Sequence, residues 1–119
     1  MAGSVPFRVY YLDDEEGLLE VFQEAFDDDD REVKVFSNVE AALDAVRSQP
    51  PDLMVLDYRL PGASGEEIAR QMDPAIPKVL VSGDFLCCDD HPAFVRVLAK
   101  PVPVAEYLAL FALLQSGQL

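Results

Sequence analysis

Residues 53–57 read LMVLD, four apolar residues in a row followed by an aspartate. A short, continuous apolar run is typical of a strand that is buried on both faces, as in a parallel sheet. Pro50 and Pro51 precede the run and would end a helix before it, because proline cannot continue the helical hydrogen-bond ladder. The segment therefore predicts a central strand that ends at Asp57.

Strand and helix patterns alternate in both directions from this run. Two capping pairs, Ser37 with Glu40 and Ser64 with Glu67, indicate where two of the helices begin. We expect strands at residues 7–12, 32–36, 53–56, 79–81 and 95–99, and helices at residues 15–26, 39–46, 64–72 and 104–115.

The pattern between Asp84 and Phe94 is ambiguous, because His91-Pro92 interrupts any helix there. We expect a short or distorted fourth helix in this segment. Five strand-then-helix units with continuously apolar strands predict a parallel sheet that is covered on both faces. The expected fold is a single α/β domain over residues 1–119, with a doubly wound, five-stranded sheet of flavodoxin-like order.

The chain has 119 residues, with 22 acidic against 9 basic side chains and a formal net charge of −13. This charge repels phosphate backbones and anionic membrane surfaces, so we expect no direct binding to nucleic acid or to membrane. No secretion signal or bilayer-spanning apolar stretch is visible. The two cysteines, Cys87 and Cys88, are adjacent, which is a poor geometry for a disulfide. We therefore expect a reduced, cytoplasmic protein.

Polar side chains stand directly after four of the five expected strands. They are Asp13 and Asp14, Asp57, Ser82 and Lys100. Ligands of a doubly wound sheet bind outside the carboxyl ends of its strands, so these side chains are expected at one rim. A single carboxylate after a strand is more often a turn residue or a helix cap. The coincidence of all of them at one edge indicates a site.

The chemistry of this rim points to a metal ion. Three clustered carboxylates repel one another unless a cation lies between them, and oxygen ligands without histidine or thiolate favour magnesium. A magnesium site beside a lysine and a hydroxyl suits phosphoryl transfer. In this interpretation Asp57 is the nucleophile and forms an acyl phosphate, while Lys100 and the Ser82 hydroxyl hold the phosphoryl oxygens.

Four segments resemble the signatures of response-regulator receiver domains. They are VYYLDDEE at residues 9–16, DLMVLDYRLPGASGEE at 52–67, VLVSGD at 79–84 and LAKP at 98–101. The likeness covers nearly the whole chain. It implies a phosphorylation-dependent switch of a two-component system rather than an enzyme, which takes its phosphoryl group from a histidine kinase or phosphotransfer protein.

The resemblance also implies a role for each residue of the rim. Asp57 would be the phosphoacceptor, Ser82 the switch hydroxyl and Lys100 the phosphate-contacting lysine. The magnesium ligands would be Asp14, Asp57, the backbone carbonyl of Arg59 and, through water, Asp13. The bond between Lys100 and Pro101 would be cis, an isomer that proline makes accessible.

Three features depart from the family pattern. Val97 replaces the aromatic residue three positions before the lysine, so that any response to Ser82 would act through packing alone. The separation of Ser82 and Lys100 is 18 residues (100 minus 82), shorter than expected by about one helical turn. Tyr58 and Arg59 are larger than usual, and they either slow access to the acceptor or simply face the solvent.

The helix expected at residues 104–115 is apolar nearly all round. Tyr107, Leu108, Phe111 and Leu114 form one stripe for the sheet, whereas Leu110 and Leu113 lie on another side. Such a helix exposes apolar surface unless something covers it. We expect a homodimer or an output protein at the face formed by residues 84–94, 95–99 and 104–115, unless Ala109 and Ala112 keep the patch small.

Two other functions remain open. A pseudo-receiver would bind proteins without phosphorylation; the intact Asp57, Ser82 and Lys100 argue against it, whereas Val97 keeps it open. A small phosphohydrolase with an aspartate nucleophile is the second, although such enzymes typically resemble Asp-x-Asp after the first strand. The chain is either a stand-alone regulator or a fragment of a longer one.

Overall fold

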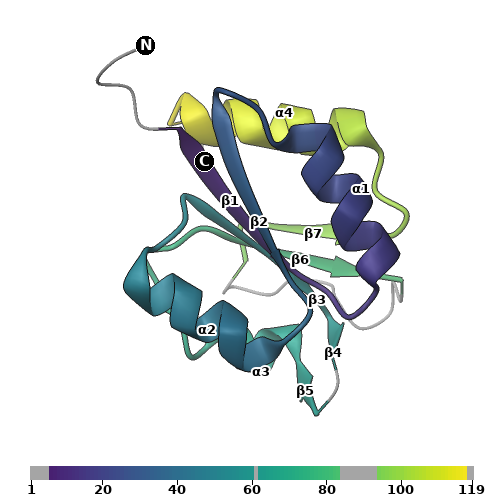
Figure 1. Ribbon diagram of the computed structural model, residues 1–119, viewed down its shortest axis with the longest axis vertical. Helices are drawn as coiled ribbons and strands as arrows, with labels where there is room; N and C mark the ends of the chain where they lie inside the picture. Colours follow the sequence, from purple (N-terminus) through teal and green to yellow (C-terminus); the bar gives the residue numbers. More distant parts are fainter. Residues whose placement is uncertain (1–5, 61, 84–93, 118–119) are drawn as a thin grey trace.

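The computed structural model describes residues 6–60, 62–83 and 94–117. Its central element is a five-stranded sheet (Figure 1). The strands are β1 (Phe7–Leu12), β2 (Arg31–Phe36), β3 (Leu53–Asp57), β6 (Lys78–Ser82) and β7 (Arg96–Ala99). They lie in the order β2-β1-β3-β6-β7, and every neighbouring pair is parallel. This is the doubly wound, flavodoxin-like order that the sequence predicted, and the fold class is confirmed.

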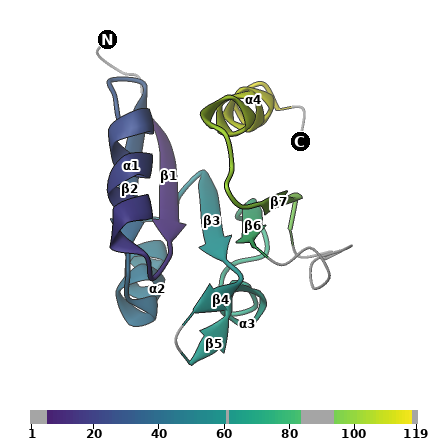
Figure 2. The same ribbon diagram turned by 90° about the vertical axis from the view of Figure 1, so that its right-hand side faces the viewer.

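Helices cover both faces of the sheet, as Figures 1 and 2 show. They are α1 (Glu16–Phe26), α2 (Val39–Ser48), α3 (Gly65–Ala69) and α4 (Val104–Gln115). Because side chains alternate along a strand, Tyr11 of β1 packs on the side of α1 and α4, whereas Tyr10 packs on the side of α2 and α3. Strand β3 is buried along its whole length, as its continuous apolar run predicted.

The cap of α2 differs from the prediction. Asn38, and not Ser37, is the N-cap residue, and its side-chain oxygen accepts a hydrogen bond of 3.0 Å from the backbone N–H of Ala41. Asparagine and serine cap helices about equally well, so the preference of the chain for Asn38 was not visible in the pattern.

The cap of α3 agrees with the prediction, but the helix is shorter. The Ser64 hydroxyl accepts a hydrogen bond of 3.2 Å from the backbone N–H of Glu67. The helix ends at Ala69, so that Met72 is buried but lies outside it. The apolar residues after Ser64 therefore predicted which side chains are buried, but not where the helix ends.

A small hairpin that the sequence did not predict lies between β3 and α3. It consists of β4 (Arg59–Leu60) and β5 (Ala63–Ser64), which pair antiparallel. Figure 2 shows it beyond the carboxyl end of β3. Gly62 has a φ of 78°, a backbone conformation that glycine adopts without steric cost. Two residues per strand are too few for a readable alternation, so the sequence pattern did not predict the hairpin.

The apolar stripe of α4 differs from the prediction at two positions, because Leu110, expected on another side, is buried against the sheet and Leu108 is not. Tyr107, Leu110 and Phe111 are buried, whereas Leu108 is 41% exposed. The prediction that Leu108 faces the sheet is therefore wrong. Residues 107, 110, 111 and 114 follow the i, i+3, i+4, i+7 spacing of one helix face, and residue 108 is rotated about 100° away from residue 107.

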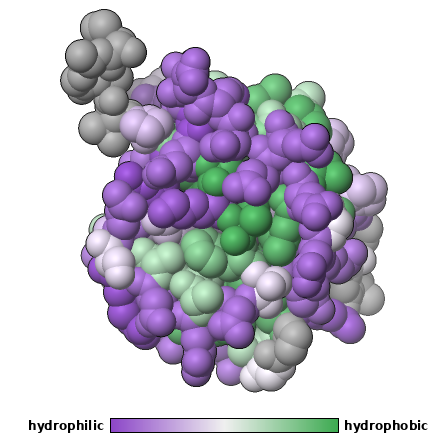
Figure 3. All heavy atoms as spheres, in the orientation of Figure 1, coloured by the Kyte–Doolittle hydropathy of each residue, from purple (hydrophilic) through white to green (hydrophobic). Residues whose placement is uncertain are grey.

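The short or distorted fourth helix, expected between Asp84 and Phe94, lies outside the described residues apart from Phe94 itself. Within residues 6–60, 62–83 and 94–117, no helix has both the length and the apolarity needed to cross a membrane. Figure 3 shows apolar surface between hydrophilic side chains on the face of Figure 1, including along the top, where α4 lies.

Candidate functional site

The carboxyl ends of the central strands meet at one edge of the sheet, and the register fixes which residues lie there. Leu12 pairs with Leu56, so that the acid pair after β1 lies beside Asp57 at the end of β3. Asp57 in turn pairs with Val81, one residue before Ser82. The structure thus brings residues from separate segments of the chain to the rim that the sequence predicted.

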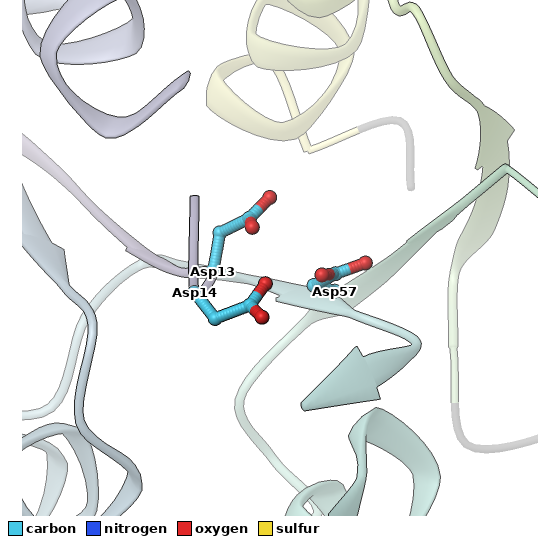
Figure 4. A group of neighbouring side chains, drawn as sticks. All are labelled: Asp13, Asp14 and Asp57. Atoms are coloured by element: carbon cyan, nitrogen blue, oxygen red, sulfur yellow. The ribbon is translucent and has the colours of Figure 1, made fainter. Parts of the chain in front are cut away.

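Three carboxylates form the centre of this rim. Asp13, Asp14 and Asp57 each offer an oxygen, and these oxygens lie within 4.8 Å of one another. Figure 4 shows Asp13 and Asp14 directed toward the side on which Asp57 lies. Asp13 is fully buried and Asp57 is 5% exposed, whereas Asp14 is exposed. Two carboxylates of the cluster are therefore buried and the third is open to solvent.

Lys100 bridges the two buried carboxylates. Its Nζ lies 3.1 Å from Oδ2 of Asp13 and 3.2 Å from Oδ1 of Asp57. Its backbone N–H donates a hydrogen bond of 2.8 Å to the carbonyl of Ser82, which fixes the end of β7 beside the end of β6. The bond from Lys100 to Pro101 is cis, as the resemblance implied.

The protonation of Asp57 is set by its surroundings. Burial raises the pKa of its carboxyl, and the neighbouring charge of Asp13 raises it further, to about 6, although the ammonium of Lys100 acts in the opposite direction. Lys100 keeps a raised pKa, because its contacts with Asp13 and Asp57 outweigh the effect of its own burial. Two anions thus share one cation.

Asp13 is the carboxylate that remains ionised. Burial alone would raise its pKa, but hydrogen bonds from the Tyr11 hydroxyl, the Glu15 backbone N–H and Lys100 outweigh burial and lower it. The Tyr11 hydroxyl lies 2.6 Å from Oδ2 of Asp13. Tyr11 was not among the predicted site residues. The signal in the sequence was its spacing from Asp13, since residues two apart on a strand point to the same side of the sheet.

Gly65 is a second residue of the site that the sequence pattern did not predict. It is the first residue of α3, and its backbone N–H donates a hydrogen bond of 2.9 Å to the carbonyl of Tyr58. A Cβ at position 65 would overlap the backbone carbonyl oxygen of Asp57 and come within 2.9 Å of the Leu80 side chain. Glycine therefore lets α3 approach the backbone of Asp57, a contact between segments that no local pattern reveals.

The remaining predicted residues surround this centre. Ser82 is buried at the end of β6. Arg59 is exposed in β4, two residues after Asp57, whereas the side chain of Tyr58 is partly buried against the cluster under α2 and α3. Of the two side chains, Arg59 faces the solvent, as one of the two expectations held, whereas Tyr58 does not. Val97 of β7 is partly buried against the same cluster.

The donor set fits magnesium. The three clustered groups are carboxylates, the hard oxygen ligands that this ion prefers, and the exposed position of Asp14 leaves room for the waters that magnesium keeps. A divalent cation would also offset the repulsion between Asp13 and Asp57, which Lys100 alone balances only in part.

The family model of the response regulator receiver domain matches residues 9–83. The chain belongs to this family. Receiver domains are signalling modules that work through phosphorylation, and they are not enzymes in the ordinary sense. This confirms the membership of the receiver family that the sequence motifs implied.

Curated relatives agree with this placement. The transcriptional regulatory protein CreB of Escherichia coli (strain K12) is 34% identical over 104 residues, which cover 85% of this chain and 43% of CreB. Sporulation initiation phosphotransferase F of Bacillus subtilis (strain 168) is 32% identical over 65 residues, covering 55% of this chain and 52% of that protein. The chain thus spans about half the length, or less, of these relatives.

Solved structures show the same fold. A CheY-like receiver domain from Methylobacillus flagellatus superposes with a TM-score of 0.83 at 20% identity, covering 92% of this chain and 99% of the other. The response regulator protein TrrA from Thermotoga maritima, solved in complex with Mg²⁺-BeF, gives a TM-score of 0.79 at 26% identity, covering 90% of this chain and 97% of TrrA.

Proposed function

We propose that this chain is a magnesium-dependent phosphorylation switch whose phosphoacceptor is Asp57. The observation that carries the proposal is the position of Asp57: it is buried at the end of a central strand, 3.2 Å from Lys100 and within 4.8 Å of two further carboxylates. A nucleophile, a cation for the phosphoryl oxygens and a set of metal ligands therefore lie together.

In the proposed reaction, a carboxylate oxygen of Asp57 attacks the phosphorus of the donor. The bond from phosphorus to the donor breaks, the donor keeps the electron pair of that bond, and an acyl phosphate remains on Asp57. Lys100 and the Ser82 hydroxyl then hold the phosphoryl oxygens. Phosphorylation would draw Lys100 from its bridge between Asp13 and Asp57 toward the new oxygens, and Val97 would respond to Ser82 by packing.

Magnesium would be held by Asp14, Asp57 and the backbone carbonyl of Arg59, with Asp13 acting through water. When bound, the ion neutralises charge on the transferring phosphoryl group. Support comes from the donor set of the site and from the similar protein TrrA, which was solved with Mg²⁺-BeF.

The donor would be a histidine kinase or phosphotransfer protein, and the location cytoplasmic, with residues 1–119 forming one receiver domain. We place the output contact, to a homodimer partner or an output protein, on residues 95–99 and 104–115; the third segment expected there, residues 84–94, lies outside the described residues apart from Phe94. The exposure of Val104 and Leu108 on α4 supports an apolar contact there.

The test is intact mass spectrometry after incubation with acetyl phosphate, with and without magnesium. We expect one phosphate-sized adduct per chain, which requires magnesium and is absent from the Asp57→Asn variant. The same adduct in Asp57→Asn would contradict the assignment of the acceptor. A wild-type chain without adduct and without magnesium binding would favour the pseudo-receiver, and repeated turnover of an aryl phosphate would favour the phosphohydrolase.

A further inference from the structure

Tyr11 lies directly beneath the carboxylate cluster. Its side chain is 3% exposed, and its hydroxyl donates a hydrogen bond of 2.6 Å to Oδ2 of Asp13. Its ring packs against Phe22 of α1, with 4.6 Å between ring centroids, and forms part of the wall of a cavity of about 370 Å³ between α1 and α4. Packing thus holds the ring, and the ring holds the hydroxyl at the carboxylate.

The other two hydrogen-bond donors to Asp13 are a backbone N–H and a charged ammonium group, whereas Tyr11 donates from a neutral hydroxyl. The Glu15 backbone N–H donates to Oδ1 at 3.0 Å, and Lys100 donates to Oδ2 at 3.1 Å. Lys100 is shared with Asp57 at 3.2 Å and would leave Asp13 when it turns to a phosphoryl group. The Tyr11 hydroxyl is neutral, belongs to the same strand end as Asp13 and makes its hydrogen bond to Asp13 without sharing it with Asp57.

We propose that Tyr11 is a positioning residue of the magnesium site, whose hydroxyl holds the Asp13 carboxylate in the orientation that supports metal binding. This inference rests on the proposed function, because it assigns a role toward the same ion. Hydrogen-bond partners of metal-ligating groups fix the orientation of those groups, and their loss typically weakens metal affinity about 10- to 100-fold. Since Asp13 acts through water, the lower end of this range applies here.

Tyr11→Phe isolates the hydroxyl, because it keeps the ring that packs against Phe22. The matched control is Tyr107→Phe, which removes the hydroxyl of another buried tyrosine in the same aromatic cluster, 5.1 Å from Phe22 between ring centroids, and leaves the hydrogen bond of Tyr11 to Asp13 in place. The measurement is the Kd for magnesium alone, from the shifts of backbone amide NMR signals during titration of the full chain. Thermal unfolding of the metal-free proteins records any loss of stability separately.

We expect a Kd about tenfold higher for Tyr11→Phe and an unchanged Kd for Tyr107→Phe. An unchanged Kd for Tyr11→Phe, at any melting temperature, would overturn the inference, and so would equal losses in both variants. Absence of magnesium binding by the wild type would also overturn it. A wild type that binds magnesium but gains no adduct from acetyl phosphate would refute the proposed function and leave the role of Tyr11 to be decided by its own Kd.

Discussion

Asp57 and Asp13 are two buried carboxylates that share the single ammonium group of Lys100. Their roles separate because their surroundings differ. Asp13 receives hydrogen bonds from Tyr11, Lys100 and the Glu15 backbone N–H, and its pKa falls. Burial and the charge of Asp13 raise the pKa of Asp57 to about 6. Without a divalent cation, the folded chain therefore holds an ionised Asp57 at a cost when the pH is neutral.

This cost predicts a pH-dependent effect of Asp57→Asn. The folded-state pKa of Asp57 lies above its unfolded value of about 3.9, so its contribution to stability is fully present below about pH 4 and is lost as the pH rises through about 6. In magnesium-free buffer at about pH 8, we predict that Asp57→Asn raises the free energy of unfolding by about 1–2 kcal/mol, after allowance for its lost pairing with Lys100.

Urea denaturation across this pH range measures the effect. The gain from Asp57→Asn should shrink toward zero near pH 4, and magnesium should reduce it at about pH 8. Asp29→Asn, at an exposed position outside the site, serves as the control and should change the free energy of unfolding by less than about 0.5 kcal/mol. An increase in the free energy of unfolding of the same size at both ends of the pH range would show that burial and Asp13 do not raise the pKa of Asp57.

At the scale of elements, the long apolar runs were readable and the short segments were not. Strand β3 and the order of the sheet followed from the uninterrupted run at residues 53–56 and its neighbours, because strands buried on both faces leave no room for polar residues. The hairpin β4–β5 and the cap at Asn38 were missed, since two residues carry no period and several residue types cap equally well.

The site divides in the same way. Asp13, Asp14, Asp57, Ser82 and Lys100 could be found, because each follows a strand and parallel strands end at one edge. Gly65 could not be assigned, because its contact with the backbone of Asp57 depends on the packing of separate segments. Tyr11 was missed although it lies two residues before Asp13, because the spacing places both side chains on one side of the sheet but does not show that the hydroxyl reaches the carboxylate.

The approach of α3 to Asp57 gives an element-scale prediction for Gly65→Ala. The added methyl group would overlap the Asp57 carbonyl, so α3 and the end of β3 must move apart. We predict a loss of about 1–3 kcal/mol in the free energy of unfolding and slower phosphorylation by acetyl phosphate. Chemical denaturation and the time course of adduct formation measure the two effects.

Gly17→Ala is the matched control for this substitution. Gly17 is the second residue of α1, and a Cβ there meets no atom within 4 Å. Alanine at this position should stabilise the chain by about 0.5–1 kcal/mol and leave phosphorylation unchanged. If Gly65→Ala behaved like Gly17→Ala in both measurements, the close contact of α3 with Asp57 would be refuted.

At the scale of the whole molecule, the exposed apolar side chains are not scattered. Among residues 6–60, 62–83 and 94–117, the large hydrophobic side chains that are exposed are Leu18 and Val21 of α1 and Val104 and Leu108 of α4. Leu18, Val21 and Val104 line the cavity between these two helices. In a chain with a net charge of −13, such a concentration of apolar surface on two helices favours a protein contact.

The output contact proposed on α4 predicts that Leu108→Ser weakens association without affecting phosphorylation. Leu108 is 41% exposed, so a hydroxyl at this position costs the fold little, about 0.5 kcal/mol or less, but removes apolar area from an interface. Sedimentation equilibrium of the phosphorylated chain should show a dimer that Leu108→Ser shifts toward monomer; for an output protein, pulldown should show the same loss. Association that is identical in both proteins would exclude Leu108 from the contact.

The position of the phosphoryl group in the chain decides whether Asp57 is the acceptor. Borohydride reduces an aspartyl phosphate to homoserine, so that peptide mass spectrometry of the reduced chain identifies the residue that carried the group. After treatment with acetyl phosphate and magnesium, we predict homoserine at position 57 alone, and none when magnesium is withheld. Homoserine at position 13 or 14, or a stable phosphate on Ser82 with an unmodified Asp57, would contradict the proposed switch.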